Sequence, residues 1–148
     1  MARYRVGVVS RNHVKIGEAG GFCQLCHGKS WQVKRMLPGD WLIYYSPREG
    51  IKEGRTLQSF TAIGRIKPGS PYQFTMDNGF TPTRRDVEYY TDAVEVPIQP
   101  LLHELSFSAN NPAWGLVLRR GVFEIPEADF LLIAGAMGVA ADAKLMAV

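Results

Sequence analysis

Closely spaced turn signals divide this chain into short extended runs, and that spacing limits the folds available to it. The runs are rich in β-branched and aromatic residues and occupy 4–10, 41–46, 59–66, 72–76, 80–90 and 122–125. Turn residues separate them, such as Pro-Gly-Asp at 38–40 and Asp-Asn-Gly at 77–79. Most connections are too short for crossover helices, which excludes a doubly wound parallel sheet. The pattern predicts an α+β fold whose five or six mainly antiparallel strands form a small barrel.

Short helices are expected to cover the openings of this barrel. A helix over 13–18, capped by Asn12 and ended by a glycine pair, would follow the first run. Leucines at helical spacing mark 97–105, and a closing helix would begin at Pro126. The alanine-rich tail over 138–148 has no stop signal, so we expect it to fray.

The length of 148 residues is typical of a single domain. A globular chain of this size buries roughly two-thirds of its surface, which allows a core without disulfides. Residues 130–141 form the longest uncharged apolar stretch, which is too short to span a bilayer. The first residues lack the long apolar run of a signal peptide. We therefore expect one soluble, cytoplasmic domain over residues 1–148.

Charge and aromatic content favour an anionic, base-containing partner. The net charge is only +3, but arginine supplies eleven of the 17 basic residues, and its planar guanidinium suits phosphate or carboxylate. Aromatic and basic side chains interleave along the chain: Trp31, Trp41, Tyr44, Tyr45, Phe60, Phe74, Phe80, Tyr89, Tyr90 and Trp114 with Arg48, Arg55, Lys67, Arg84, Arg85, Arg119 and Arg120. Bases stack on aromatic faces while phosphates bind basic groups, so this mixture suits nucleic acid. The alternative is that most of these rings fill the core.

The sequence Cys-Gln-Leu-Cys-His at 23–27 matches the attachment motif of c-type haem. That attachment occurs in an exported, oxidising compartment, and no export signal is present. A zinc site needs four ligands, and His13 adds no paired spacing to this cluster, while His103 lies far away in the sequence. We interpret the two cysteines as incidental and expect no metal and no cofactor. Motifs of nucleophilic, metal-dependent or nucleotide-hydrolysing enzymes are also absent from the sequence.

Seven segments, in order along the chain, resemble EVE-domain proteins: 6–14, 20–29, 36–48, 60–64, 72–74, 84–87 and 114–117. They span residues 4 to about 135 and are similar to the small, single-domain prokaryotic branch of that family. The resemblance implies a PUA-like pseudo-barrel, related to YTH and ASCH domains. It also implies that the barrel mouth accepts a single base of DNA or RNA, modified like a methylated cytosine or adenine.

The same resemblance implies which residues border the pocket. The base-pocket set is Ser10, Phe22, Cys23, Gln24, Tyr45, Ser46, Arg84 and Arg85, and the phosphate contacts are Arg48 and Arg120. Phe22 would stack on the base, and Gln24 would bond its edge, with Ser10 or Ser46 adding a hydrogen bond. Strand alternation would turn one guanidinium of the adjacent arginine pair toward the pocket and the other away. In the family the first cysteine is often another small residue, which argues against Cys23 as a ligand.

A small hydrolase that acts on a modified nucleoside is the alternative, because some ASCH-type relatives of the fold are hydrolases. A lysine and a glutamate close together in the pocket would favour it. Lys15 with Glu18, or Lys29, are the candidates, although a Lys/Glu pair at this helical spacing is usually solvated. We therefore expect a non-catalytic, nucleic-acid-binding module.

Overall fold

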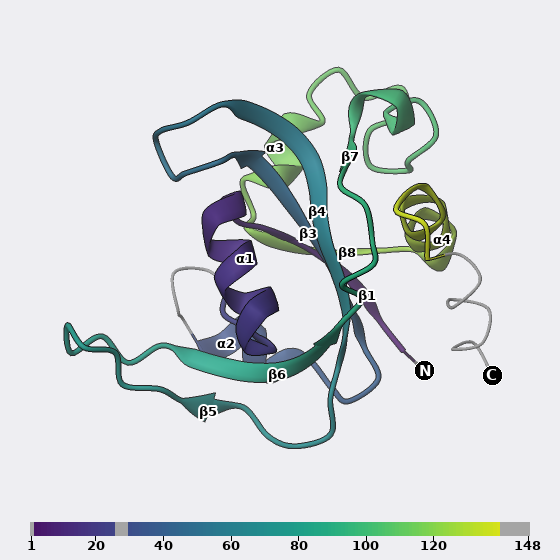
Figure 1. Ribbon diagram of the computed structural model, residues 1–148. Helices are drawn as coiled ribbons and strands as arrows, with labels where there is room; N and C mark the ends of the chain where they lie inside the picture. Colours follow the sequence, from purple (N-terminus) through teal and green to yellow (C-terminus); the bar gives the residue numbers. More distant parts are fainter. Residues whose placement is uncertain (1, 26–29, 140–148) are drawn as a thin grey trace.

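A curled mixed sheet forms the centre of the protein, as the computed structural model shows for residues 2–25 and 30–139 (Figure 1). Within this part the strand order is β2-β6-β4-β3-β1-β8, with β5 paired to β6 and β7 to β4. The strands are β1 (Tyr4–Val8), β2 (Phe22–Cys23), β3 (Trp41–Arg48), β4 (Thr56–Ile66), β5 (Tyr72–Gln73), β6 (Thr83–Tyr89), β7 (Val96–Pro97) and β8 (Val122–Ile125). The five longer strands and the half-barrel curl confirm the predicted α+β fold.

One strand pair is parallel, and the chain between its members explains why. β1 runs parallel to β3, with Tyr4 opposite Trp41, whereas β3–β4, β4–β6 and β1–β8 are antiparallel. A parallel pair needs a long crossover, and residues 9–40 supply one that contains two short helices.

Local sequence predicted some helix boundaries better than others. Helix α1 (Arg11–Gly20) begins before the predicted 13–18, because Ser10 occupies the N-cap position and Asn12 lies inside the helix. The backbone N–H of Asn12 donates to the carbonyl of Glu49, so the β3–β4 loop satisfies one end of this helix. Gly21 ends it in the left-handed conformation that glycine tolerates, as predicted.

The remaining helices are short. Helix α4 (Glu127–Ala136) follows Pro126 as expected, whereas α2 (Ser30–Arg35) lies where no helix was predicted. The leucines of 97–105 form only a 3-10 turn, η2 (Gln99–Leu101), followed by further turns. The short helix α3 (Gly115–Leu118) precedes β8.

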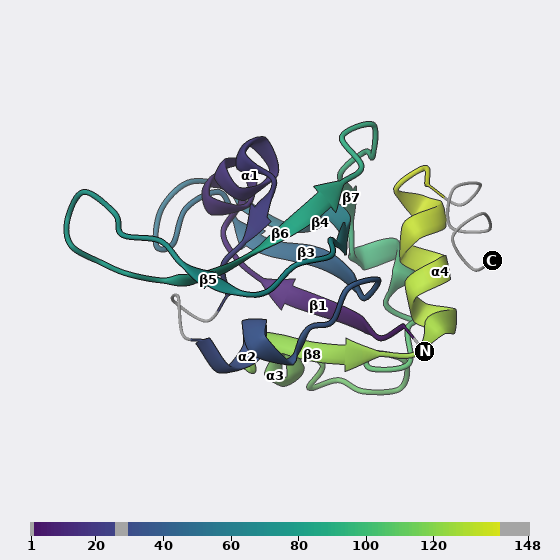
Figure 2. The same ribbon diagram turned by 90° about the horizontal axis from the view of Figure 1, so that it is seen from below.

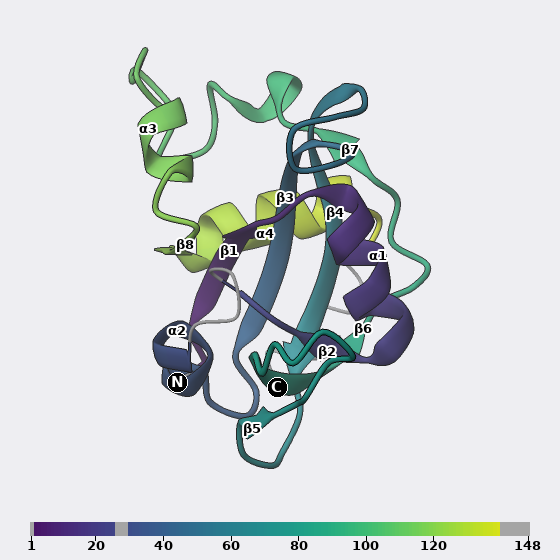
Figure 3. The ribbon, with the colours of Figure 1, turned by 90° about the vertical axis from the view of Figure 1, so that its left-hand side faces the viewer.

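Two apolar cores lie on opposite faces of the sheet, and β3 contributes to both. Its odd-numbered residues Trp41, Ile43 and Tyr45 join the core that packs against α4. Its even-numbered residues Leu42 and Tyr44 join the core beneath α1 and α2. Figure 3 shows α4 passing behind β3 and β4, with α1 beside β4 on the near side. Both faces of β3 are therefore buried, and the cleft described below opens on the α1 side.

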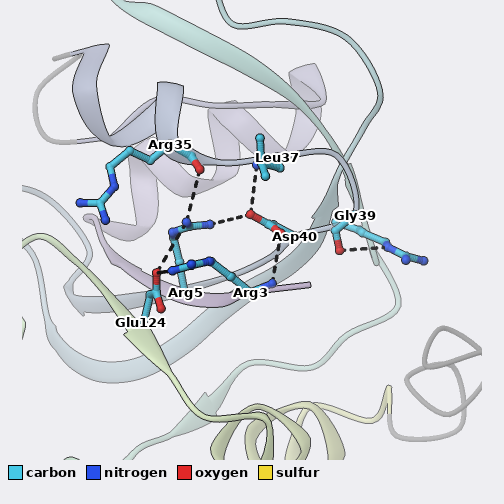
Figure 4. A network of polar contacts seen from close by, with 8 residues as sticks. Arg3, Arg5, Arg35, Leu37, Gly39, Asp40 and Glu124 are labelled. Carbon is cyan, nitrogen blue, oxygen red and sulfur yellow. Dashed lines mark hydrogen bonds and ion pairs between the residues drawn. The ribbon is translucent and has the colours of Figure 1, made fainter. Parts of the chain in front are cut away.

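A buried ion pair joins the start of β1 to the turn before β3 (Figure 4). Arg5 Nη1 donates to Asp40 Oδ2 at 2.9 Å, and the backbone N–H of Leu37 donates to the same oxygen at 3.0 Å. The backbone N–H of Arg3 donates to Asp40 Oδ1 at 3.1 Å. Burial by itself raises the pKa of Asp40, but these donors outweigh it and hold the pKa below its usual value.

Within 138–148, where we expected fraying, only Gly138 and Val139 are described, and Val139 is buried. Across residues 2–25 and 30–139, no helix is long and apolar enough to cross a membrane.

Candidate functional site

A cleft of about 850 Å³ opens where β1 runs into α1. Its walls come from the ends of β1 and β3, from α1 and α2, from the β3–β4 and β5–β6 connections, and from the turn before β8. Figure 2 shows the β5–β6 connection projecting beyond the body of the molecule. Segments far apart in the sequence thus meet at one site.

A buried phenol, Tyr44, lines the cleft, and the partly buried phenol of Tyr89 packs against it. Tyr44 stacks on Tyr89 with ring centroids 6.4 Å apart. The Tyr89 hydroxyl donates to the carbonyl of Phe22 at 2.8 Å. Burial raises the pKa of both phenols, so they stay neutral at physiological pH.

Large apolar side chains lie exposed around the cleft. Trp31 is 52% exposed and Phe80 is 43% exposed, and Ile16 and Ile51 are exposed still further. Exposed apolar surface concentrated at one concave site marks a place where a partner binds. Trp31 and Phe80 offer flat faces on which a planar group can stack.

The charged side chains of the described cleft lining are all arginines. Arg48, Arg84, Arg119 and Arg120 line it, and none of the four forms an ion pair with another described residue. No aspartate or glutamate belongs to the described lining. Four guanidinium groups in one cleft, with no carboxylate in its described lining, attract a negatively charged ligand.

Arg84 is held differently from the other three arginines. Its guanidinium carbon lies 4.0 Å from the ring centroid of Phe22 and 4.0 Å from that of Phe74. Its Nε donates to Gln24 Oε1 at 3.0 Å. One face of Phe22 is therefore covered by Arg84, so the open aromatic faces of the cleft belong to Trp31 and Phe80.

The structure brings six of the ten sequence-predicted site residues together in the cleft: Ser10, Phe22, Gln24, Arg48, Arg84 and Arg120. The other four, Cys23, Tyr45, Ser46 and Arg85, are buried outside its lining.

Strand alternation explains why three of these four predicted residues do not line the cleft. Successive side chains of a strand point to opposite faces, so Cys23 and Arg85 turn away from the cleft that Phe22 and Arg84 line. Arg85 Nη2 donates to the Gly69 carbonyl at 2.7 Å. By the same alternation Tyr45 packs in the core on the α4 side of the sheet, and Tyr44 lines the cleft instead.

The fourth predicted residue outside the cleft lining, Ser46, is buried and hydrogen-bonded to β4. Its hydroxyl lies 2.7 Å from the Thr61 hydroxyl, with which it shares a hydrogen bond. Ser10, in contrast, lines the cleft, and its hydroxyl lies 3.3 Å from His13 Nδ1.

The structure describes only residues 23–25 of the Cys-Gln-Leu-Cys-His sequence that was considered for haem or zinc. Cys23 is fully buried, and burial raises the pKa of its thiol to about 12. Cys26 and His27 lie outside the described residues. Among the residues that the structure describes, no group of three or more histidine, cysteine, aspartate or glutamate side chains could hold a metal ion.

The lysine and glutamate considered for hydrolysis do meet, but away from the cleft. Lys15 Nζ lies 3.1 Å from Glu18 Oε1 and 3.1 Å from Glu95 Oε2. It also donates to the Thr61 carbonyl at 3.4 Å, so it connects α1 to β4. Neither Lys15 nor Glu18 belongs to the described lining, and Lys29 is outside the described residues.

The cleft residues that the sequence did not assign to the site include three exposed aromatic or basic side chains, Trp31, Phe80 and Arg119. Each carried a weak signal. Trp31 is an aromatic residue in a polar segment, Phe80 follows a hairpin turn, and Arg119 is adjacent to the predicted Arg120. These features indicate exposure, but they do not say that the three side chains face one cleft.

Comparison with known proteins gives consistent matches. The sequence model of the EVE domain matches residues 4–136. A UPF0310 protein from Mesorhizobium japonicum is 50% identical over 140 residues, which cover 93% of each chain. UPF0310 protein YdcG from Bacillus subtilis is 48% identical over 136 residues, which cover 92% of each chain.

Solved structures support the fold alone, because their sequence identities are low. A Rhodopseudomonas palustris protein has a TM-score of 0.57 at 18% identity and covers 93% of this chain and 94% of its own. A hypothetical protein from Leishmania major has a TM-score of 0.56 at 9% identity, with 97% and 98% covered.

Proposed function

Because the chain belongs to the EVE domain family, we propose that it binds nucleic acid and holds a single modified base, of the methylated cytosine or adenine type, in this cleft. The lining of the cleft carries the proposal. It combines exposed aromatic side chains with four arginines, none of which pairs with an acidic group among the described residues, and its described part contains no carboxylate. A nucleic acid offers the matching chemistry, because its backbone is anionic and its bases stack.

The cleft residues divide into two roles. Arg48, Arg119 and Arg120 would contact phosphates and set the overall affinity. Trp31 would supply a stacking face for the base, and stacking is worth about 1–3 kcal/mol per base. Gln24 would bond the base edge through its amide N–H groups, because its Oε1 already accepts from Arg84.

Titration of short oligonucleotides at several salt concentrations tests this division. Each DNA or RNA oligonucleotide carries one methylated cytosine, one methylated adenine, or the plain base. We expect wild-type protein to prefer one modified form. Arg120→Gln should weaken all sequences alike and reduce the salt slope by roughly 0.7–0.9, because one phosphate contact is lost.

Changes to the base contacts should behave differently. Trp31→Ala or Gln24→Ala should reduce the preference for the modified base and leave the salt slope nearly unchanged, since stacking and edge contacts release few counterions. Lys67→Gln is the charge control, because Lys67 is exposed and outside the described lining. Equal binding of modified and plain oligonucleotides would refute the proposal, and turnover of a modified nucleoside would favour the hydrolase.

A further inference from the structure

Arg84 differs from the other cleft arginines in that its direction is fixed. The Arg84 guanidinium carbon lies 4.0 Å from the ring centroids of Phe22 and Phe74, and these two rings make no ring contact with each other, so the group packs between two separate rings. The hydrogen bond from Arg84 Nε to Gln24 Oε1 further restricts how the guanidinium group can turn between the rings. Such a clamped group loses little conformational freedom when it forms further hydrogen bonds.

Within the described part of the chain, one edge of the clamped guanidinium forms no hydrogen bond. Arg84 Nη1 and Nη2 have no hydrogen-bond partner among the described residues, and Arg84 lines the cleft. The group therefore presents a planar pair of N–H donors in a set direction. Such a fork binds two acceptors that lie in one plane.

A guanine base offers that acceptor pair through O6 and N7, and this pairing is the commonest base-specific contact of arginine. A phosphate also accepts from arginine, but Arg48, Arg119 and Arg120 already supply cations without an aromatic clamp. The cleft volume of about 850 Å³ lies near the upper end of the roughly 300–1,000 Å³ of small-molecule sites. Space for a neighbouring nucleotide is therefore present.

Resting on the proposed function, we propose that Arg84 recognises a guanine next to the base held in the cleft, so that the protein selects a guanine-containing dinucleotide. The flat clamp makes Arg84 a specificity-determining residue, while the other three arginines contact the backbone. Lysine keeps the charge but has no planar fork, and this difference makes the proposal testable.

The probe is a set of single-stranded DNA oligonucleotides that carry one methylated cytosine or adenine. The base on each side of it is varied in turn among guanine, inosine, 7-deazaguanine and adenine. Wild-type protein should prefer guanine to adenine at one flanking position by roughly 5- to 150-fold. Inosine should bind like guanine, because it keeps O6 and N7, whereas 7-deazaguanine, which lacks N7, should lose most of the preference.

Two variants locate the effect. Arg84→Lys should abolish the guanine preference while it keeps the salt slope, and Phe74→Leu should reduce that preference several-fold without removing a charge. Phe74 is exposed, so its replacement leaves the core intact. Arg3→Lys is the matched control, because Arg3 is exposed and pairs with Glu124 outside the described lining.

The outcomes separate this inference from the proposed function. A preference for the modified base without any guanine preference would refute the role of Arg84 and leave the proposed function standing. A guanine preference that survives in Arg84→Lys would also refute it. Absence of binding to every oligonucleotide would refute both.

Discussion

Replacing Asp40 with asparagine would leave the buried Arg5 guanidinium without its closest counterion, and Glu124 Oε1, 3.8 Å from Arg5 Nη2, would be the acidic group that remains beside it. The Asp40 and Arg5 side chains are only 3% and 5% exposed, so water cannot take the place of the carboxylate. Removing one member of a buried ion pair costs about 3–5 kcal/mol. Asparagine keeps one carbonyl oxygen to accept from Leu37 or Arg3, so we expect a loss near 3 kcal/mol. A domain is stabilised by about 5–15 kcal/mol in all, so this loss is large.

Urea denaturation monitored by tryptophan fluorescence measures this loss. The midpoint should fall while the m-value stays unchanged, because the surface exposed on unfolding is the same. Arg55→Gln is the control, since the Arg55 side chain is 82% exposed, its ion pair with Glu49 does not involve Arg5, and exposed pairs contribute at most about 1 kcal/mol. Adding Arg5→Met to Asp40→Asn should recover part of the stability, because it removes the stranded charge.

The pH dependence follows from the pKa of Asp40, which lies below its ordinary value of about 3.9. A carboxyl whose pKa is lowered by folding stabilises the protein above that ordinary value, and the contribution disappears as pH falls through the folded pKa. The difference between wild type and Asp40→Asn should be constant between about pH 5 and 7 and shrink below about pH 4. A difference that grows in acid, or none at neutral pH, would contradict this reasoning.

Three further perturbations probe the thiol and the packing of the sheet and of α4. In a Cys26→Ser variant, the remaining thiol of Cys23 should react with a thiol reagent only after denaturation. It is fully buried, and burial raises its pKa to about 12. Rapid reaction with the folded protein would contradict this. Gly64→Ala should lower the melting temperature and cost about 1–3 kcal/mol, because a Cβ there would lie 2.6 Å from a β6 side chain and 2.8 Å from a β6 carbonyl oxygen; unchanged thermal unfolding would mean that β6 can shift freely. Asp129→Ala should cost about 1–3 kcal/mol in a denaturant titration, because its carboxylate accepts from both the backbone N–H and the hydroxyl of Ser106; Asp129→Asn, which keeps one acceptor, should lose less.

Local sequence determined the elements whose signals are complete within a few residues. The Asp-Asn-Gly turn at 77–79, the strand Val122–Ile125 and the helix that follows Pro126 all lie where the pattern predicts them. The ordered EVE-like segments indicated the family, and the sequence model of that domain matches residues 4–136. Each of these signals depends on turn geometry, strand periodicity or residue order, so no tertiary contact is needed to recognise it.

Tertiary structure decided which side chains share the cleft. Both faces of β3 are buried, so its periodicity does not say whether Tyr44 or Tyr45 faces the ligand side. Trp31 and Phe80 meet only because the β1–β3 crossover and the β5–β6 connection end at the same opening. The charge state of the cleft is likewise a tertiary property, because the acidic residues that neutralise other arginines lie elsewhere in the fold. Sequence patterns record which face of a local element is apolar, whereas a binding site depends on distances between elements, and those distances are set only when the chain packs.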